Sequence, residues 1–201
     1  MASTPATESA DERAFTPKGT STRERVVAAA RVALLEDGYD GLVLRELAAS
    51  LDMKLGNLQY YFPTRDALVL HVLEIEGTRD ADLVEERRRT DQPIDAFRFV
   101  VRDMADRYRG DSGRLLSMIT ALAQTREAYL KLYLDSYANF YPTFQRLLGD
   151  LRRDLSNEEV AMRARVVNAL VEGSAFQTDV GDVEAFLDRI VTEAERIALR
   201  D

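Results

Sequence analysis

Residues 44–65 read LRELAASLDMKLGNLQYYFPTR. Apolar residues spaced by three and four positions mark two short helices here, with Leu44, Leu47, Ala48 and Leu51 on the first and Leu58 and Phe62 on the second. Only Asp52 to Lys54 separates the two helices. Two short helices joined by a turn of three or four residues form a helix-turn-helix, which places its second helix in the DNA major groove. The stretch therefore predicts a DNA-binding unit, although helix pairs of this kind are also common packing units.

The flanking residues predict one helix on each side of this pair. Upstream, a capping box, an apolar stripe and a glycine predict a helix over 22–37: Ser21 with Glu24, then Val26, Ala30, Ala33 and Leu34, then Gly38. Downstream, Pro63 ends the second short helix, and Thr64 can cap the next one. That helix is expected from about residue 65 into the high 70s or beyond.

The rest of the chain also shows helical spacing. Gly and Pro are few, and long segments are rich in Ala, Leu, Arg and Glu. Start and stop signals predict further helices over 93–108, 115–123, 126–148, 157–177 and from 182 to the end. We expect Gly110 to Gly113 to separate the first two of these, and Pro142 to kink or split the third. The expected fold class is all-α, with about nine helices.

Length and composition indicate a globular chain with three segments. Its 201 residues are 46% hydrophobic, which is enough to fill a core. The absence of cysteine excludes disulfides and thiolate metal sites, and no apolar run approaches the length of a membrane span. We expect a soluble, cytoplasmic protein. Its segments would be a flexible arm over 1–20, the helix-turn-helix domain over 21–66 and a helical ligand-binding and dimerisation domain over 67–201.

The charge balance at first argues against a nucleic-acid partner. The net charge is −8, and residues 1–66 contain eight Lys and Arg against ten Asp and Glu. Cations that neutralise phosphates supply most of the non-specific affinity for DNA. If this segment binds DNA, the placement of its few cations must matter more than their number.

The residues around the helix pair are similar to the N-terminal signature of the TetR family of transcription regulators. The similarity covers about 45 residues, in order and spacing: Thr22-Arg23-Glu24-Arg25, Gly38-Tyr39-Asp40, Leu44-Arg45-Glu46-Leu47-Ala48 and Gly56-Asn57-Leu58-Gln59-Tyr60-Tyr61-Phe62-Pro63-Thr64-Arg65. Three positions depart from the family pattern. Val43 replaces a helix-capping Ser or Thr, Asp52 replaces a turn Gly, and Lys54 replaces the Ser that caps the second helix.

The resemblance implies roles at DNA for individual residues. Base edges would face Leu55, Gly56, Asn57 and Gln59, and Asn and Gln are suited to paired hydrogen bonds with adenine. Phosphates would contact Lys54, Tyr60, Tyr61, Thr64 and Arg65. Arg45 would reach a phosphate or a guanine, and Lys18 and Arg13 would follow an adjacent minor groove. Alternatively, Tyr60 or Tyr61 packs against the first helix, and Arg45 with Glu46 is an ordinary exposed pair.

An aromatic face on the helix over 126–148 suggests a ligand pocket. Tyr129, Tyr133, Tyr137, Phe140, Tyr141 and Phe144 share this face, and buried Tyr hydroxyls need hydrogen-bond partners. A plain core is the competing interpretation. As a pocket, the face would combine with apolar and polar residues of neighbouring helices. The candidate ligand-binding residues are Met104, Tyr108, Met118, Leu122, Tyr129, Tyr133, Tyr137, Phe140, Asn168, Val171 and Gln177.

The last two helices are candidates for a homodimer interface. Residues 169–173, Ala-Leu-Val-Glu-Gly, resemble a family pattern in the helix that pairs across a two-fold axis. We expect the last helix to contribute its apolar residues Phe186, Leu187, Ile190, Val191 and Ile197. A two-fold dimer would match a palindromic DNA site.

The function expected is that of a repressor that binds a palindromic operator as a dimer and leaves it when a small-molecule effector binds. The alternative is a helical protein-interaction module without DNA binding, suggested by the acidic balance. An enzyme is not expected, because no catalytic signature occurs, and no cofactor is expected. His71 and Glu74 stand three residues apart, but one His without Cys makes a poor metal site.

Overall fold

The computed structural model describes residues 17–177 and 179–200, with side chains from Ser21 onward. All regular structure in this part of the chain is helical. The helices are α1 (Pro17–Gly41), α2 (Leu44–Ser50), α3 (Leu55–Tyr61), α4 (Arg65–Thr90), α5 (Pro93–Arg109), α6 (Asp111–Ala123), α7 (Glu127–Leu151), α8 (Asn157–Gly173), the 3-10 turn η1 (Ser174–Phe176) and α9 (Val183–Leu199). The predicted all-α class is confirmed.

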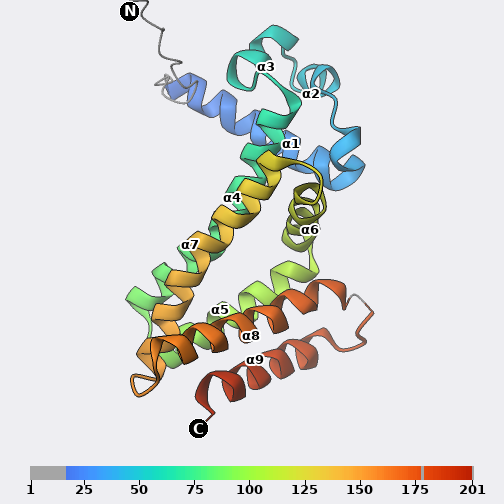
Figure 1. Ribbon diagram of the computed structural model, residues 1–201. Helices are drawn as coiled ribbons and strands as arrows, with labels where there is room; N and C mark the ends of the chain where they lie inside the picture. The colour runs from blue at the N-terminus through green and yellow to red at the C-terminus, as the bar shows by residue number, and fades with distance from the viewer. Residues whose placement is uncertain (1–16, 178, 201) are drawn as a thin grey trace, which may run out of the picture.

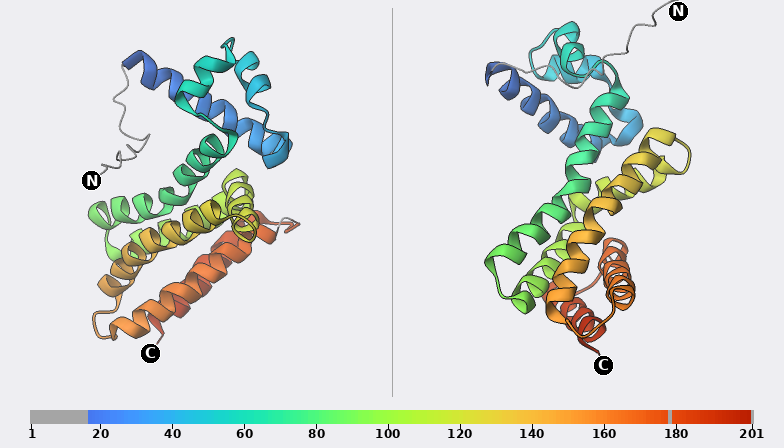
Figure 2. Two further views of the ribbon diagram at one scale, coloured as in Figure 1. Left: turned by 45° about the horizontal axis from the view of Figure 1, so that its top comes forward. Right: turned by 60° about the vertical axis from the view of Figure 1, so that its left-hand side comes forward.

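Two long helices connect the ends of the molecule. Helices α1 to α3 gather at one end, α5, α8 and α9 form the other, and α4 and α7 run side by side between them (Figures 1 and 2). Gly77 allows α4 and α7 to approach closely, since a Cβ at this position would lie 2.3 Å from Ser136 Oγ. Helix α6 packs against α4, α5 and α7 and also reaches α1.

The predicted starts of α1 and α6 are wrong, and α7 is not split. Helix α1 begins at Pro17, so Lys18 lies in its first turn and not in an arm, whereas Arg13 lies outside the described residues. Helix α7 continues through Pro142, because a helix supported along its length by α4 tolerates one missing hydrogen bond. Helix α6 begins at Asp111 and includes Gly113, where a Cβ would lie 1.7 Å from the Tyr108 carbonyl oxygen. Only glycine fits that tight corner between α5 and α6.

Side-chain caps are present at three helix starts, among them the predicted cap at Thr64. The side chains of Thr64, Ser156 and Asp182 accept hydrogen bonds from backbone amides of α4, α8 and α9 respectively. Helices α2 and α3 begin without a side-chain cap, as the residues Val43 and Lys54 imply. Asp52 adopts φ 55°, the left-handed conformation that a turn glycine would take and that Asp tolerates better than most residues.

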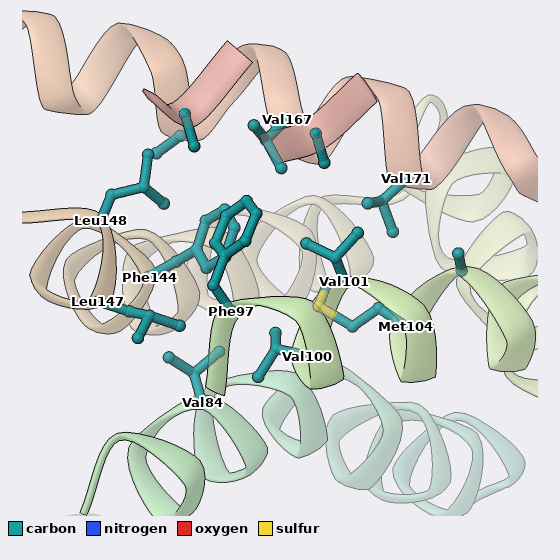
Figure 3. Packing of buried hydrophobic residues seen from close by; sticks show 14 of the residues in the cluster. Val84, Phe97, Val100, Val101, Met104, Phe144, Leu147, Leu148, Val167 and Val171 are labelled. Atoms are coloured by element: carbon teal, nitrogen blue, oxygen red, sulfur yellow. The ribbon is translucent and has the colours of Figure 1, made fainter. Parts of the chain in front are cut away.

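The buried apolar side chains form two clusters. The first joins α4, α5, α7, α8 and α9, and its centre includes Phe97, Met104, Phe144 and Val171 (Figure 3). The second fills the helix-turn-helix end, where Leu34, Leu47, Leu58 and Phe62 pack together. It also contains Leu115, Ile119 and Tyr129, which belong to α6 and α7. The core of the N-terminal end is therefore continuous with helices of the C-terminal region.

Candidate functional site

Helix α3 buries one face and exposes the other. Leu58 and the following Phe62 are buried in the N-terminal core. The residues expected to meet DNA lie on the opposite side and are exposed: Lys54, Leu55, Gly56, Asn57, Gln59 and Tyr60. Because α3 is only seven residues long, its position depends on this apolar anchor and on the turn before it.

The turn between α2 and α3 is held by backbone hydrogen bonds. The Met53 amide donates to the Ala48 carbonyl at 2.9 Å, and the Asp52 amide donates to the Ala49 carbonyl at 3.1 Å. Asp52 takes the left-handed conformation within this turn, and α3 begins three residues later at Leu55. The chain therefore reverses at Asp52 and presents Lys54 and α3 to solvent.

Some of the residues expected to hold phosphates are exposed, and others make contacts within the protein. Arg45, Lys54 and Tyr60 are exposed, and 57% of Tyr60 remains accessible. Tyr61 is half-buried against the N-terminal core and meets the Tyr60 ring edge-on at 5.3 Å. Thr64 uses its hydroxyl as the α4 cap, where Oγ1 accepts from the Ala67 amide at 3.1 Å.

Arg65 belongs to a cluster that links the N-terminal end to α7, which we call the Tyr39 joint. Its members are Tyr39, Arg65, Asp66, Arg126 and Tyr129. The Tyr39 ring lies between two guanidinium groups, 4.2 Å from that of Arg65 and 4.4 Å from that of Arg126. The hydroxyls of Tyr39 and Tyr129 donate to Asp66 Oδ1 at 2.5 and 2.9 Å. The hydrogen bond from Tyr39 is the largest of the effects that hold the pKa of Asp66 below its usual value.

A second polar contact links α1, α4 and α6. Glu76 on α4 is only 5% exposed. Its Oε1 accepts from Arg31 Nε at 2.8 Å, and its Oε2 accepts from Ser112 Oγ at 3.0 Å. The carboxylate is therefore paired and hydrogen-bonded, as burial requires. Gly77 and Gly113, the next residues along α4 and α6, line the cavity described below.

A cavity of about 390 Å³ lies among α4, α5, α6, α7, α8 and η1. This volume is within the range of small-molecule sites, roughly 300 to 1,000 Å³. Its lining residues are Gly77, Asp80, Tyr108, Gly113, Leu116, Ser117, Ile119, Thr120, Ala121, Gln124, Tyr133, Ser136, Tyr137, Phe140, Asn168, Glu172, Ala175 and Phe176.

Five of the expected ligand-binding residues line this cavity, namely Tyr108, Tyr133, Tyr137, Phe140 and Asn168. Six do not, and five of these six pack in other parts of the protein. Met104 and Val171 point into the C-terminal core (Figure 3). Tyr129 belongs to the Tyr39 joint, and Met118 and Leu122 pack against the N-terminal core. Gln177 lies outside the lining, and its carbonyl accepts a hydrogen bond from Arg109. The aromatic face of α7 is thus partly pocket and partly core.

Sequence reasoning missed the two carboxylates of the cavity, Asp80 and Glu172. Asp80 is buried; its Oδ1 accepts from Arg107 Nη2 at 2.5 Å, and its Oδ2 accepts from the Tyr108 hydroxyl. Glu172 Oε1 accepts from the Tyr137 hydroxyl at 2.6 Å and from Asn168 Nδ2 at 2.9 Å. A signal existed for Asp80, since it shares the inward stripe of α4 with Leu73, Gly77 and Val84 at spacings of four, three and four.

Burial and the neighbouring carboxylates keep the cavity's tyrosines protonated. Burial is the largest cause that raises the pKa of the Tyr137 hydroxyl, followed by its hydrogen bond to Glu172. Burial and the charge of Asp80 likewise raise the pKa of Tyr108. Both hydroxyls therefore stay neutral donors at physiological pH.

His71 lies beside Glu74 and Phe62. Its Nδ1 lies 3.5 Å from Glu74 Oε2, and its ring lies 5.6 Å from that of Phe62. No three His, Cys, Asp or Glu side chains gather as metal ligands within residues 17–177 and 179–200. In the same part of the chain, no helix has the length and apolar character needed to cross a membrane.

An exposed second helix on a buried apolar anchor is the arrangement of a helix-turn-helix DNA-binding unit. Residues 26–72 match the profile of the bacterial regulatory proteins of the tetR family. The chain thus carries the N-terminal domain of the TetR family on the fold of that family's regulators.

Solved structures share this fold across most of the chain. A protein from Mesorhizobium loti MAFF303099 assigned to the TetR family matches with TM-score 0.76 at 14% identity, over 92% of this chain and 98% of that one. A transcriptional regulator from Rhodococcus sp. Rha1 matches with TM-score 0.68 at 19% identity, over 89% and 94%. A protein from Saccharomonospora viridis, solved in complex with choline, matches with TM-score 0.68 at 17% identity, over 90% and 97%. No curated protein matches the chain.

Proposed function

We propose that this protein is a ligand-responsive transcription repressor that binds a palindromic operator as a homodimer and leaves it when a small-molecule effector binds. One observation carries the proposal. The core that anchors the exposed α3 includes Leu115 and Ile119 of α6, and Ile119 also lines the cavity. A ligand in the cavity would therefore touch a helix that supports the DNA-reading unit. In this role the protein is a regulator and not an enzyme.

In the proposed complex, α3 reads bases and its surroundings hold phosphates. Asn57 and Gln59 would make paired hydrogen bonds to adenine, Leu55 would meet a thymine methyl, and Gly56 would let the backbone approach. Arg45 and Lys54 are exposed beside α3 and would contact phosphates. Arg65 stacks over the Tyr39 ring and would contact a phosphate from that position.

The proposed dimer interface is a stripe on α8 and not the apolar side of α9. Leu187 and Ile190 are buried in the chain's own core, and Phe186, Val191 and Ile197 pack partly against it, so they are poorly placed to meet a partner. On α8 the residues Met162, Val166, Ala169 and Gly173 fall at spacings of four, three and four, and the first three are exposed. An unpartnered apolar stripe that ends in small residues suits close helix pairing across a two-fold axis.

The dimer proposal is tested with two substitutions of the same residue type. Val166 on α8 and Val32 on α1 are 45% and 50% exposed. We expect Val166→Glu to convert the dimer to a monomer in light-scattering measurements, because it places a charge in the apolar interface, whereas Val32→Glu remains dimeric. If the Val166→Glu variant remains dimeric, the α8 stripe is not the dimer interface.

The proposed response to ligand runs through α6 and α4. Helix α6 supplies six lining residues between Gly113 and Ala121. Its Ser112 shares the Glu76 carboxylate with Arg31 of α1. A ligand that shifts α6 would therefore bias α1 and α4 and change the spacing of the two recognition helices, with a coupling of about 1 to 3 kcal/mol. The choline complex of the Saccharomonospora viridis protein supports a ligand-holding role for this fold.

The experiment that tests the proposal is selection of bound fragments from random double-stranded DNA by the purified full chain. We expect a two-fold symmetric motif whose half-sites are separated by about one DNA turn or a multiple of it. Enrichment of a motif without two-fold symmetry would contradict the proposal that a dimer binds a palindromic operator. No enrichment at all would favour the interaction module without DNA binding.

A further inference from the structure

The charged side chains in the described lining of the cavity are both acidic. Asp80 and Glu172 are the charged residues among its described lining, and no Lys or Arg belongs to it. Asp80 is compensated from outside the cavity, because Arg107 Nη2 lies 2.5 Å from its Oδ1. Its second oxygen accepts from the Tyr108 hydroxyl. The charge of Asp80 is therefore balanced by the protein itself.

Among the described residues, the two hydrogen-bond donors to Glu172 are both neutral. Both of its hydrogen bonds, from Tyr137 and Asn168, reach the same oxygen, Oε1. Within the described residues, no Lys, Arg or His nitrogen lies within 4.0 Å of this half-buried carboxylate. Arg165, on the same helix, stacks over the Tyr141 ring at 4.8 Å. A carboxylate that is partly removed from water without a cation favours a positively charged partner.

Aromatic rings stand beside this carboxylate. Tyr133, Tyr137 and Phe140 line the cavity together with Glu172. The Tyr137 ring meets the Tyr133 ring edge-on at 4.9 Å, while its own hydroxyl bonds Glu172. Aromatic faces attract organic cations, most strongly where water is displaced. The carboxylate and the rings therefore favour the same kind of ligand.

We propose that the effector of this cavity is an organic cation, an amine or a quaternary ammonium with an apolar body. Its charge lies against Glu172 and its body along the aromatic side of α7. This inference rests on the proposed ligand-responsive function and adds the chemical class of the ligand. An anion is excluded by repulsion from Glu172. A neutral molecule of the same shape gains the apolar contacts alone.

Three probes of nearly the same shape separate charge from shape: benzylamine, benzyl alcohol and benzoate, which are cationic, neutral and anionic at pH 7. Their dissociation constants are measured by ligand-observed NMR titration of the purified full chain. We expect benzylamine to bind at least about tenfold more tightly than benzyl alcohol, through the ion pair and the rings together, and benzoate to bind weakest.

Two variants test whether Glu172 causes the preference for benzylamine over benzyl alcohol. Glu172→Gln keeps the shape and an oxygen that accepts from Tyr137 and Asn168, so it should fold and bind benzyl alcohol as the wild type does. We expect it to lose most of the tenfold preference for benzylamine. Glu158→Gln removes the same charge from the exposed start of α8, away from the lining, and should keep the preference.

The outcomes distinguish this inference from the proposed function. Equal binding of benzylamine and benzyl alcohol, or a preference that survives Glu172→Gln, overturns the cation assignment and leaves a ligand-responsive repressor standing. If none of the probes binds at millimolar concentration, the cation assignment fails and the ligand-responsive part loses support. The operator-binding part is judged separately, by the symmetric DNA motif.

Discussion

The helix-turn-helix and the cavity are built in opposite ways. The helix-turn-helix comes from one continuous stretch, residues 44–65, whose buried side chains are all apolar and whose polar side chains are mostly exposed. The cavity is assembled from residues between Gly77 and Phe176 on α4, α5, α6, α7, α8 and η1. A local unit of this kind can be recognised from spacing alone. An assembled one depends on how helices pack, which no short stretch of sequence specifies.

The two regions also handle charge differently. Around α3 the cations Arg45 and Lys54 are exposed, in a chain whose net charge is −8. In the cavity the carboxylates are buried or half-buried and each accepts two hydrogen bonds. In the proposed function, DNA affinity would therefore depend on a few well-placed cations, whereas ligand selectivity would come from cavity groups removed from water. The Tyr39 joint and the Glu76 contact connect these two environments.

The largest predicted effect is a difference in stability between substitutions of two leucines on opposite faces of α3. Leu58 is 0% exposed in the N-terminal core, and Leu55, one turn earlier, is 37% exposed. We expect Leu58→Ala to lower the free energy of unfolding by about 2 to 5 kcal/mol through lost contacts and a cavity. Leu55→Ala should change it by about 0.5 kcal/mol or less. Urea denaturation of both variants measures the difference, and equal losses would contradict the buried anchor.

The helix-turn-helix could be predicted from the sequence more completely than the cavity. Leu58 and Phe62 could be assigned to the core because a short helix needs one apolar face, and the exposed Asn57 and Gln59 follow from that assignment. The cavity residues of α7 were found in part, since Tyr133, Tyr137 and Phe140 share the aromatic face. Nothing in the periodicity distinguishes them from Phe144, which is core.

The missed residues depend on contacts between distant helices. Glu172 meets Tyr137 across 35 positions of sequence, and Asp80 meets Tyr108 across 28. The dimer interface stays a prediction, and it too depends on contacts that the sequence pattern does not specify. An apolar stripe on α9 does not tell whether it faces its own chain or a partner, and here Leu187 and Ile190 face their own core.

The prediction of intermediate size concerns DNA affinity. It distinguishes a residue near α3 that contacts a base from one that contacts a phosphate. We expect Asn57→Ala to reduce discrimination between the selected motif and random DNA by about 1 to 3 kcal/mol, because a base contact is lost. Lys54→Ala should weaken both DNAs alike and reduce the slope of log affinity against log salt by about one. Fluorescence-anisotropy titrations at several salt concentrations measure both quantities. Equal losses on both DNAs for Asn57→Ala would remove its base-reading role.

The smallest effect is expected at the Tyr39 joint, where the two regions meet. Asp66 accepts hydrogen bonds from Tyr39 and Tyr129, and these bonds lower its pKa in the folded state. A lowered pKa means that the charged form stabilises the fold above the unfolded pKa, about 4 for Asp, and that this contribution is lost as the pH falls through the folded pKa. Because 52% of the side chain is exposed, solvent screening limits the contribution to about 1 kcal/mol.

Asp66→Asn tests this assignment by comparing unfolding free energies at pH 7 and at about pH 3. The variant should be less stable than the wild type by about 1 kcal/mol at pH 7, because the amide is a weaker acceptor for the two hydroxyls and has no charge for Arg126. The difference should shrink at pH 3, where the wild-type carboxylate begins to protonate. Asp82→Asn, an exposed position on the same helix, serves as the control and should show no such convergence. A difference that is the same at both pH values would mean that Asp66 acts through packing and not through its charge.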